Sequence, residues 1–275
     1  MNRRQVSAVT CARNEEKNLP ETLTALKKQT LRLKQVVVVD DGSTDKTGKI
    51  AEAFGYTVIN LPFHKESFTG RPELAERFNV GLNAITRPLP DYVLIVGADH
   101  PLPIHYVEQL VTRMESSKKL VVASGRILGE PYYEDFPRGS GRLVKTWFWK
   151  QVSNLQYPVV WCWEEWLCFK AMQLGYKVKC FTDIVSKVKR SSGKPSSEAR
   201  GWGKSMYALG YDWKYVFARC VITGLKSPRV GTNMLMGWIR HKDVKRSDVA
   251  DWVKQRQKKQ FWRRVRRIVK RGGRR

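Results

Sequence analysis

The sequence lacks the features that mark disulfide-stabilised, zinc-binding and membrane-spanning proteins. Its five cysteines are an odd number with no Cys-x-x-Cys pair, which argues against a disulfide framework and a structural zinc site. Free thiols fit a reducing compartment, so we expect a cytoplasmic protein. The opening residues contain no apolar signal region. Arg219 and Lys226 interrupt the longest apolar stretch, so we also expect no transmembrane helix.

Acidic residues are scarce, and the resulting positive charge is unevenly distributed. The 275 residues include 51 Lys and Arg but only 25 Asp and Glu, which gives a net charge of +26. Residues 240–275 hold 16 Lys and Arg and three Asp, so half of the excess lies in this C-terminal segment. All ten tryptophans follow residue 146. We therefore expect two parts of the chain with different roles.

The first 123 residues show alternating strand and helix patterns. Residues 36–39 are four consecutive valines, which predict a strand buried on both faces. Strands are predicted over 5–11, 36–39, 57–61, 92–96 and 120–123, and helices over 18–29, 44–54, 72–85 and 104–116. The alternation predicts a mostly parallel sheet flanked by helices, with ligands bound beyond the carboxyl ends of the strands.

The second half of the chain is less regular. We expect irregular structure over 125–157, a helix over 164–174, a strand over 177–181, a basic mobile loop over 187–203 and helical structure over 205–239.

Acidic side chains follow three of the predicted strands. Glu15 comes shortly after the first, Asp41 directly after the second and Asp99 after the fourth. Glu15 and Asp41 suit a ligand rich in N–H and O–H donors, such as a nucleobase or a ribose. Asp99 suits a divalent cation on the ligand's phosphates, because Mg²⁺ and Mn²⁺ prefer oxygen ligands. Taken singly, Asp41 and Asp99 are also explained as turn or helix-capping residues.

Together these motifs resemble glycosyltransferase family 2. The resemblance is carried by the runs from Ala12 to Glu16, from Val36 to Asp45 and from Asn79 to Ala84. It is strong over residues 5–100 and weaker onward to about residue 182. It implies the GT-A fold, a Rossmann-like α/β architecture, and transfer of a sugar from a nucleotide-diphospho-sugar with inversion at the anomeric carbon.

The resemblance also implies site residues. Glu15 and Asp41 would line the nucleoside pocket, with Asp41 facing the base, and Asp99 would be the last carboxylate of a metal-binding Asp-x-Asp. The expected nucleotide-sugar-binding residues are Cys11, Ala12, Arg13, Glu15, Asp41, Arg71 and Ala98. Gly97 replaces the first Asp of the metal motif, which should weaken metal binding. We expect Asp99 to hold Mg²⁺ or Mn²⁺, and either His100 compensates for the missing carboxylate or basic side chains neutralise the diphosphate instead.

An acidic pair opens the predicted helix that ends before Gly175. It resembles the family's catalytic-base segment. The spacing back from Gly175 favours Glu164, whereas the pair itself favours Glu165, and both stay open. Inversion in one displacement requires a base for the acceptor hydroxyl, and the flanking tryptophans are expected to raise the carboxylate pKa. The alternative is an acidic pair that stabilises the helix N-terminus.

Basic side chains are candidates for contacting the donor's diphosphate. Arg71 precedes the third helix and is expected to reach the nucleotide, whereas Arg77 is interpreted as a solvated helix charge. Lys187, Lys189 and Arg190 follow the acidic helix. They either close over the diphosphate or remain a solvated loop, and the sequence does not decide between the two.

The C-terminal segment is predicted to be an amphipathic basic helix. Apolar residues recur at helical spacing among many Lys and Arg: Val249, Trp252, Val253, Phe261, Trp262, Val265, Ile268 and Val269. Such a helix is typical of an anionic membrane surface, here contacted through residues 249–270. Nucleic acid is the less favoured partner for this charge.

The interpretation from sequence is a membrane-peripheral glycosyltransferase with a UDP- or GDP-sugar donor. Its acceptor would be lipid-linked or another glycan. We predict a catalytic domain over 1–182, a segment over 183–239 that completes the acceptor site, and the basic tail over 240–275. The alternative is a catalytically inactive protein of the same fold that binds nucleic acid through the tail.

Overall fold

The computed structural model describes residues 4–190 and 195–259, which fall into two compact units. The sheet unit comprises Met1–Thr69, Glu73–Val159 and Lys170–Ser192. The helical unit comprises Gly70–Pro72, Val160–Phe169 and Gly193–Arg275.

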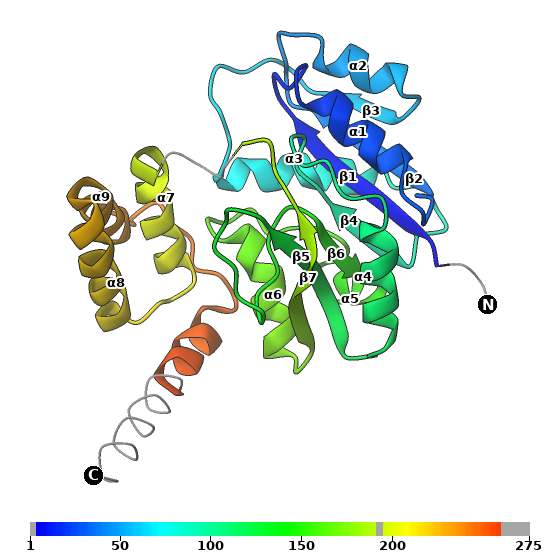
Figure 1. Ribbon diagram of the computed structural model, residues 1–275. Coiled ribbons are helices and arrows are strands. Elements are labelled where there is room, and N and C mark those ends of the chain that lie inside the picture. Colours follow the sequence, from blue (N-terminus) through cyan, green and yellow to red (C-terminus); the bar gives the residue numbers. More distant parts are fainter. Residues whose placement is uncertain (1–3, 191–194, 260–275) are drawn as a thin grey trace. The chain divides into compact units, whose positions relative to one another are not determined.

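One mixed sheet organises the sheet unit (Figure 1). Within the described residues its seven strands are β1 (Val6–Ala12), β2 (Gln35–Asp40), β3 (Thr57–Asn60), β4 (Tyr92–Ile95), β5 (Leu120–Ile127), β6 (Arg142–Lys145) and β7 (Lys177–Ser186). Their order is β3-β2-β1-β4-β6-β5-β7. Strand β6 runs antiparallel to both of its neighbours, and the other pairs are parallel. The prediction of a mostly parallel sheet is confirmed.

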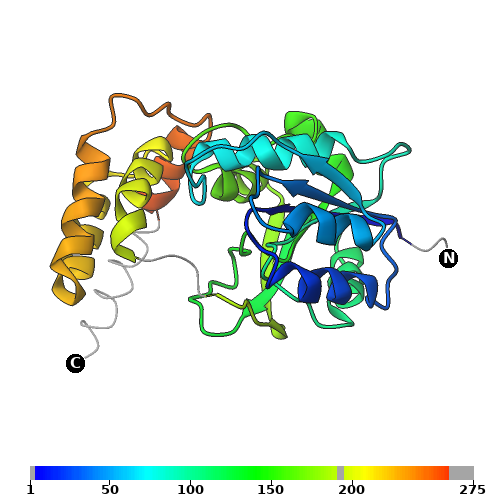
Figure 2. The same ribbon diagram turned by 90° about the horizontal axis from the view of Figure 1, so that it is seen from above.

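The helices of this unit cover both faces of the sheet (Figure 2). They are α1 (Leu19–Lys27), α2 (Thr47–Ala53), α3 (Pro72–Asn83), α4 (Tyr106–Glu115), α5 (Thr146–Ser153) and α6 (Trp163–Gln173). Helices α3 and α6 both begin in the helical unit. Buried side chains of α1, α2 and α4 share one core cluster with one face of β1, β2 and β4. Helix α3 packs on the other face.

The packing of α3 depends on a glycine. A Cβ atom built on Gly81 would lie 2.5 Å from Val9 Cγ1 and 2.9 Å from Val39 Cγ2. These two valines belong to β1 and β2, and both are fully buried. The four-valine segment is therefore enclosed from both sides, as its composition predicts.

The strand register places the ends of β1, β2 and β4 together. Ala12 pairs with Asp40 at the end of β1 and β2, and Val9 pairs with Ile95 in β4. The loops that follow these three strands therefore leave the same edge of the sheet, which is where ligands bind in parallel sheets of this kind.

Two predictions for the less regular half are wrong. Residues 125–157 are not wholly irregular, because they contain β6 and α5. The predicted loop over 187–203 ends early, because α7 (Pro195–Ala208) begins inside it. Both segments are short or polar, so they show no clear periodicity in the sequence.

The helical unit packs three helices together (Figure 1). Helices α8 (Trp213–Lys226) and α9 (Pro228–Ile239) join α7 around Met206, Val216, Cys220, Val230 and Met234. A further helix covers residues 250–259 of the described range. In the described part of the chain, no helix combines the length and the apolar composition that a membrane span requires.

Candidate functional site

Three carboxylates lie in the loops that leave the carboxyl ends of β1, β2 and β4. The Asp41 backbone N–H donates to the Ala12 carbonyl (2.8 Å), which extends the β1–β2 pairing by one residue. The Glu15 N–H donates to Thr47 Oγ1 (2.8 Å) at the start of α2. Glu15 and Asp41 are both buried. The predicted convergence of acidic side chains at this edge is therefore present.

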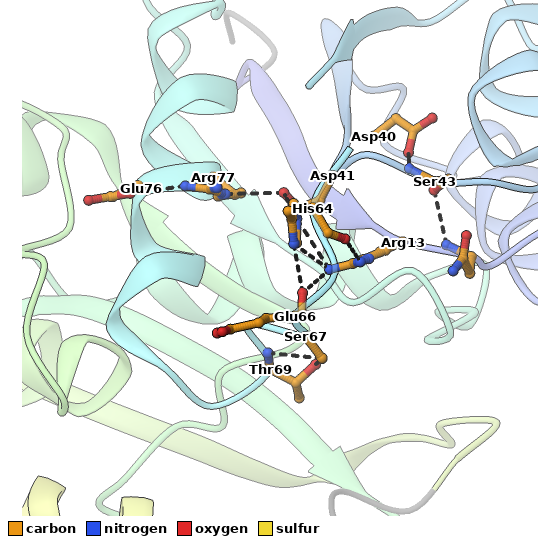
Figure 3. Close-up of polar contacts among 11 residues, drawn as sticks. Arg13, Asp40, Asp41, Ser43, His64, Glu66, Ser67, Thr69, Glu76 and Arg77 are labelled. Atoms are coloured by element: carbon orange, nitrogen blue, oxygen red, sulfur yellow. Dashed lines mark hydrogen bonds and ion pairs between the residues drawn. The ribbon is translucent and has the colours of Figure 1, made fainter. Parts of the chain in front are cut away.

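Two nitrogen donors approach the same oxygen of Asp41 (Figure 3). His64 Nε2 lies 3.0 Å and Arg77 Nε lies 3.1 Å from Asp41 Oδ1. The Asp41 side chain is only 6% exposed. No partner for Oδ2 is found in the part of the chain that the structure describes. Because a carboxylate oxygen accepts more than one hydrogen bond, Asp41 retains acceptor capacity for a ligand.

This contact corrects the interpretation of Arg77 as a solvated charge. Arg77 lies on α3, and its side chain is 22% exposed while it donates to the buried Asp41. Its guanidinium also lies 4.6 Å from the centre of the Phe68 ring. Burying Asp41 beside this cation removes the cost of an unpaired buried charge.

The loop after β3 folds over Asp41. Arg13 donates hydrogen bonds to the carbonyl oxygens of His64 and Glu66, and its guanidinium lies 2.6 Å from His64 Nδ1. The His64 ring stacks on Phe68 with centroids 4.2 Å apart. His64 Nδ1 also lies 2.6 Å from the Glu66 carbonyl oxygen. Sequence analysis missed His64, since nothing in the pattern around it marks a contact with Asp41.

Gly42 allows the loop after β3 to pack closely against the backbone after β2. Gly42 has a φ of +67°, and a Cβ atom there would lie 2.6 Å from the Pro62 carbonyl oxygen. The loop therefore packs directly on the backbone that follows β2, where only glycine fits.

Arg190 brings Glu15 and Asp99 together. It donates through one terminal nitrogen to Glu15 Oε1 and through Nε to Asp99 Oδ2, the latter at 3.3 Å. The Lys189 N–H donates to the Asp99 carbonyl (2.9 Å), which fixes this segment after β7 against the loop after β4. The Arg190 side chain is 61% exposed. Among the described basic residues of the predicted loop, Arg190 is thus the one whose side chain contacts Glu15 and Asp99.

Gly97, which stands where the metal motif has its first Asp, is closely packed. A Cβ atom on Gly97 would lie 3.2 Å from both Asp99 Oδ1 and Ser140 Oγ. Ser140 Oγ accepts from the Gly97 N–H (2.8 Å) and contacts His100 Nδ1 (2.6 Å). The other ring nitrogen of His100 lies 2.9 Å from Ser186 Oγ. Both ring nitrogens of His100 are thus engaged by hydroxyl groups.

The residues around Asp99 fit a divalent cation only with help from the donor. Asp99 is the one carboxylate of the motif, and His100 is fully buried with a pKa that burial lowers to about 4. Among the described residues, no three His, Cys, Asp or Glu side chains are grouped to hold a metal ion. Mg²⁺ commonly combines one or two carboxylates with substrate phosphates. Asp99 meets that requirement once a diphosphate supplies the other oxygens.

The other expected binding residues are divided between the units. Cys11 is partly buried and Ala12 and Ala98 are buried, all at the ends of β1 and β4. Burial, followed by the charge of Asp41, raises the Cys11 pKa well above its usual value, which disfavours the thiolate form. Arg71 belongs to the helical unit, where its carbonyl accepts from Trp163 Nε1 (3.1 Å).

Glu164 and Glu165 occupy the first turn of α6, as predicted. Both are partly exposed. Within the same unit, burial and then the charge of Glu164 raise the pKa of Glu198 on α7. The structure thus adds a third carboxylate near the predicted pair, one that the sequence analysis did not single out.

The first residues of the predicted amphipathic tail are packed within the helical unit. Val249 and Val253 are buried, and Trp252 packs against Phe169 with ring centroids 6.4 Å apart. Arg256 lies over the Trp252 ring at 5.3 Å. These apolar residues of the predicted membrane face therefore contact the helical unit. Residues 260–270, which carry the rest of that face, lie outside the described residues.

The comparison with known families identifies the fold and its relatives. The model of glycosyl transferase family 2 matches residues 7–177, which span the carboxylates Glu15, Asp41 and Asp99 and the acidic start of α6. The chain belongs to glycosyl transferase family 2. The fold prediction is therefore confirmed, and the matched residues 7–177 include every carboxylate that the sequence analysis assigned to the site.

Two curated proteins are similar to parts of this family 2 chain. A 4,4'-diaponeurosporenoate glycosyltransferase from Staphylococcus haemolyticus is 39% identical over 64 residues, which cover 23% of this chain and 17% of that protein. The glycosyltransferase GlyA from Streptococcus pneumoniae is 26% identical over 143 residues, 47% of this chain and 20% of GlyA. This chain thus matches less than a quarter of the length of these curated relatives.

A solved structure shows the same fold over almost the whole chain. The mannosyltransferase PcManGT from Pyrobaculum calidifontis, in complex with GDP-Man and Mn²⁺, superimposes with a TM-score of 0.61. The match covers 98% of this chain and 84% of that one at 14% identity. This likeness establishes the GT-A architecture.

Proposed function

We propose that this protein transfers a sugar from a UDP- or GDP-sugar to a hydroxyl or phosphate acceptor, with inversion at the anomeric carbon. The observation that carries the proposal is the convergence of Glu15, Asp41 and Asp99 at one sheet edge in a family 2 chain. Solved relatives of this fold were determined with UDP-glucose, UDP-GlcNAc or GDP-mannose. This range leaves the nucleotide and the sugar open.

Asp41 is proposed to accept a hydrogen bond from the nucleobase. Its Oδ1 already accepts from His64 and Arg77, so the base N–H would use Oδ2. A hydrogen bond to a charged group contributes about 1.5–3 kcal/mol. Arg77 would keep its contact throughout, because it compensates the charge of the buried carboxylate.

Arg190 is proposed to turn from the carboxylates to the diphosphate when the donor binds. In the free protein it neutralises Glu15 and Asp99. Its side chain is largely exposed, so it can exchange partners without unpacking the sheet unit. A guanidinium binds phosphate oxygens in the same forked geometry that it uses with carboxylates. Departure of Arg190 from Asp99 would free that carboxylate.

A divalent cation, Mg²⁺ or Mn²⁺, would use Asp99 as its protein ligand. When bound, it would neutralise charge on the leaving nucleotide diphosphate. His100 is left out of this proposal because Ser140 and Ser186 engage both of its ring nitrogens.

Glu164 or Glu165 is proposed to take the proton from the acceptor hydroxyl. The resemblance of this segment to the family's catalytic-base segment supports that role. The acceptor is proposed to be lipid-linked, at the cytoplasmic face of a membrane. The support for a lipid acceptor is the apolar composition of the helical unit and the cationic segment over 240–275.

The proposal is tested with a panel of UDP- and GDP-sugars. We expect one of them to raise the melting temperature, more so with Mn²⁺, and to be hydrolysed or transferred with release of its nucleotide. The double variant Glu164→Ala, Glu165→Ala should retain donor binding and lose turnover. Glu108→Ala is the matched control, because it also removes an acidic residue from the first turn of a helix.

Two outcomes would count against the assignment. Full turnover in the double variant would exclude both glutamates as the base. Absence of any shift with every nucleotide sugar, combined with salt-dependent binding to nucleic acid, would favour the inactive alternative.

A further inference from the structure

Helix α8 exposes a continuous row of large apolar side chains. Trp213, Phe217, Val221 and Leu225 follow one another at intervals of four, which places them along one side of a helix. Their exposed fractions are 60%, 55%, 45% and 83%, and Ile222 beside them is 61% exposed. Single exposed apolar residues are ordinary, but a contiguous row marks an interaction surface.

An adjacent side of α8 is used in packing. Val216 and Cys220 are buried in the cluster that joins α7, α8 and α9. Next to them, a Cβ atom on Gly231 of α9 would lie 2.7 Å from Gly224 Cα, so the two helix backbones are in close contact. The orientation of α8 is thereby fixed, and the row from Trp213 to Leu225 remains exposed.

Apart from Asp212, which caps the start of α8, the charges that accompany the exposed row are positive. From Trp213 to Ile239 the two helices contain Lys214, Arg219, Lys226 and Arg229 and no Asp or Glu. Lys214, Arg219 and Lys226 lie on α8 itself and are exposed. A helix with an exposed apolar ridge, three exposed cations and no acidic residue beyond its capping Asp212 is complementary to an anionic lipid surface, which offers a hydrocarbon interior beneath negative headgroups.

We propose that α8 docks this row into the interfacial region of an anionic lipid bilayer. The apolar ridge would enter the boundary between headgroups and acyl chains, and Lys214, Arg219 and Lys226 would contact the headgroups. This surface is distinct from residues 249–270, whose first apolar residues are packed inside the helical unit.

The charges argue against two other occupants. A second copy of the chain joined through the same face would bring like-charged Lys214, Arg219 and Lys226 together across a two-fold interface. A nucleic acid backbone would contact the cations but leave Phe217 and Leu225 without an apolar partner.

The docking of α8 rests on the proposed function, since it would bring the protein to a lipid-linked acceptor. Docking and sugar transfer are nevertheless tested by separate measurements. Lipid binding is measured without donor, and donor binding is measured without lipid. Failure of the first leaves sugar transfer intact as a proposal, and failure of the second leaves the docking surface intact.

The test is flotation of the full-length protein with two kinds of vesicle. One contains phosphatidylcholine alone, and the other contains phosphatidylcholine with phosphatidylglycerol. We expect binding to the anionic vesicles. The variant Phe217→Ser, Leu225→Ser should bind at least about tenfold more weakly, because it removes two large apolar side chains from the bilayer. The matched control is Ile104→Ser, Leu174→Ser, which removes comparably exposed apolar residues, 50% and 48%, from the sheet unit.

The charges are tested separately. Replacing Lys214, Arg219 and Lys226 together by Gln should weaken binding to anionic vesicles by about 100-fold, from about 1 kcal/mol for each charge. Circular dichroism and the thermal shift with donor should be unchanged in every variant. Undiminished vesicle binding by the Ser variant would overturn the proposal. The proposal would also be overturned if the unmodified protein were a dimer and Phe217→Ser, Leu225→Ser made it a monomer. A second copy of the chain would then cover the row.

Discussion

Replacing Arg77 by Met tests whether the charge on α3 supports the buried carboxylate at the site. The change removes the guanidinium and keeps a flexible chain of similar length on the helix. Asp41, only 6% exposed, would then retain His64 as its one described side-chain partner. A neutral His64 ring compensates the charge of the Asp41 carboxylate less well than the Arg77 guanidinium does.

The expected loss follows from the exposure of the two partners. Removing one partner from a fully buried ion pair costs about 3–5 kcal/mol, whereas an exposed pair is worth about 0–1 kcal/mol. Arg77 is 22% exposed, and His64 remains beside Asp41. We therefore expect Arg77→Met to lower the free energy of unfolding by about 2 kcal/mol, which is about 4–8 °C in melting temperature for a domain of this size. Donor affinity should fall with it, because Asp41 loses the contact that positions it.

Urea unfolding followed by far-UV circular dichroism measures the change. The matched control is Arg113→Met on α4, since Arg113 pairs with Asp183 and both side chains are at least half exposed. This control should change stability by no more than about 1 kcal/mol. Equal effects of the two substitutions would refute the reasoning. So would unchanged donor affinity in Arg77→Met.

Two further predictions concern buried positions. Burial lowers the pKa of His100 to about 4. As the pH falls below about 6.5, His100 is therefore protonated in the unfolded chain before it is protonated in the folded protein. The free energy of unfolding should drop by about 3 kcal/mol between that pH and pH 4. His100→Gln should flatten this part of the pH profile of urea unfolding, and the exposed His105→Gln should leave it unchanged. Gly81→Ala should lower the free energy of unfolding by about 1–3 kcal/mol, although alanine is the better helix former, because its Cβ would press on Val9. Gly224→Ala, which meets only Gly231 Cα at 4.0 Å, is the control in the same melts, and equal effects would contradict the packing argument.

The parts of the fold that were predicted correctly are those in which the local pattern determines the structure. Four valines between turn signals define β2, and the alternation around them defines the parallel strands. The acidic residues that follow β1, β2 and β4 converge because parallel strands end at a common edge. That step needs only the order of the elements and therefore follows from the sequence.

The parts that were missed depend on contacts between distant residues. Arg77 carries the same signal as any solvated arginine on a helix, and only folding brings it to Asp41. His64 and Ser140 lie in loops without periodicity, and their roles come from the backbone path that places them beside Asp41 and His100. Arg190 was one of several basic residues in a predicted loop, and only the structure shows that it pairs with Glu15 and Asp99.

Calorimetric titration of UDP and GDP into the protein and into its Asp41→Asn variant tests the central claim most directly. The substitution keeps the shape of the side chain and removes its negative charge. We predict saturable binding of one of the two nucleotides at one site per chain, weakened by at least about tenfold in the variant through loss of a hydrogen bond to a charged acceptor. Binding of neither nucleotide, or equal affinity of the two proteins, would contradict the assignment of this sheet edge as the donor site.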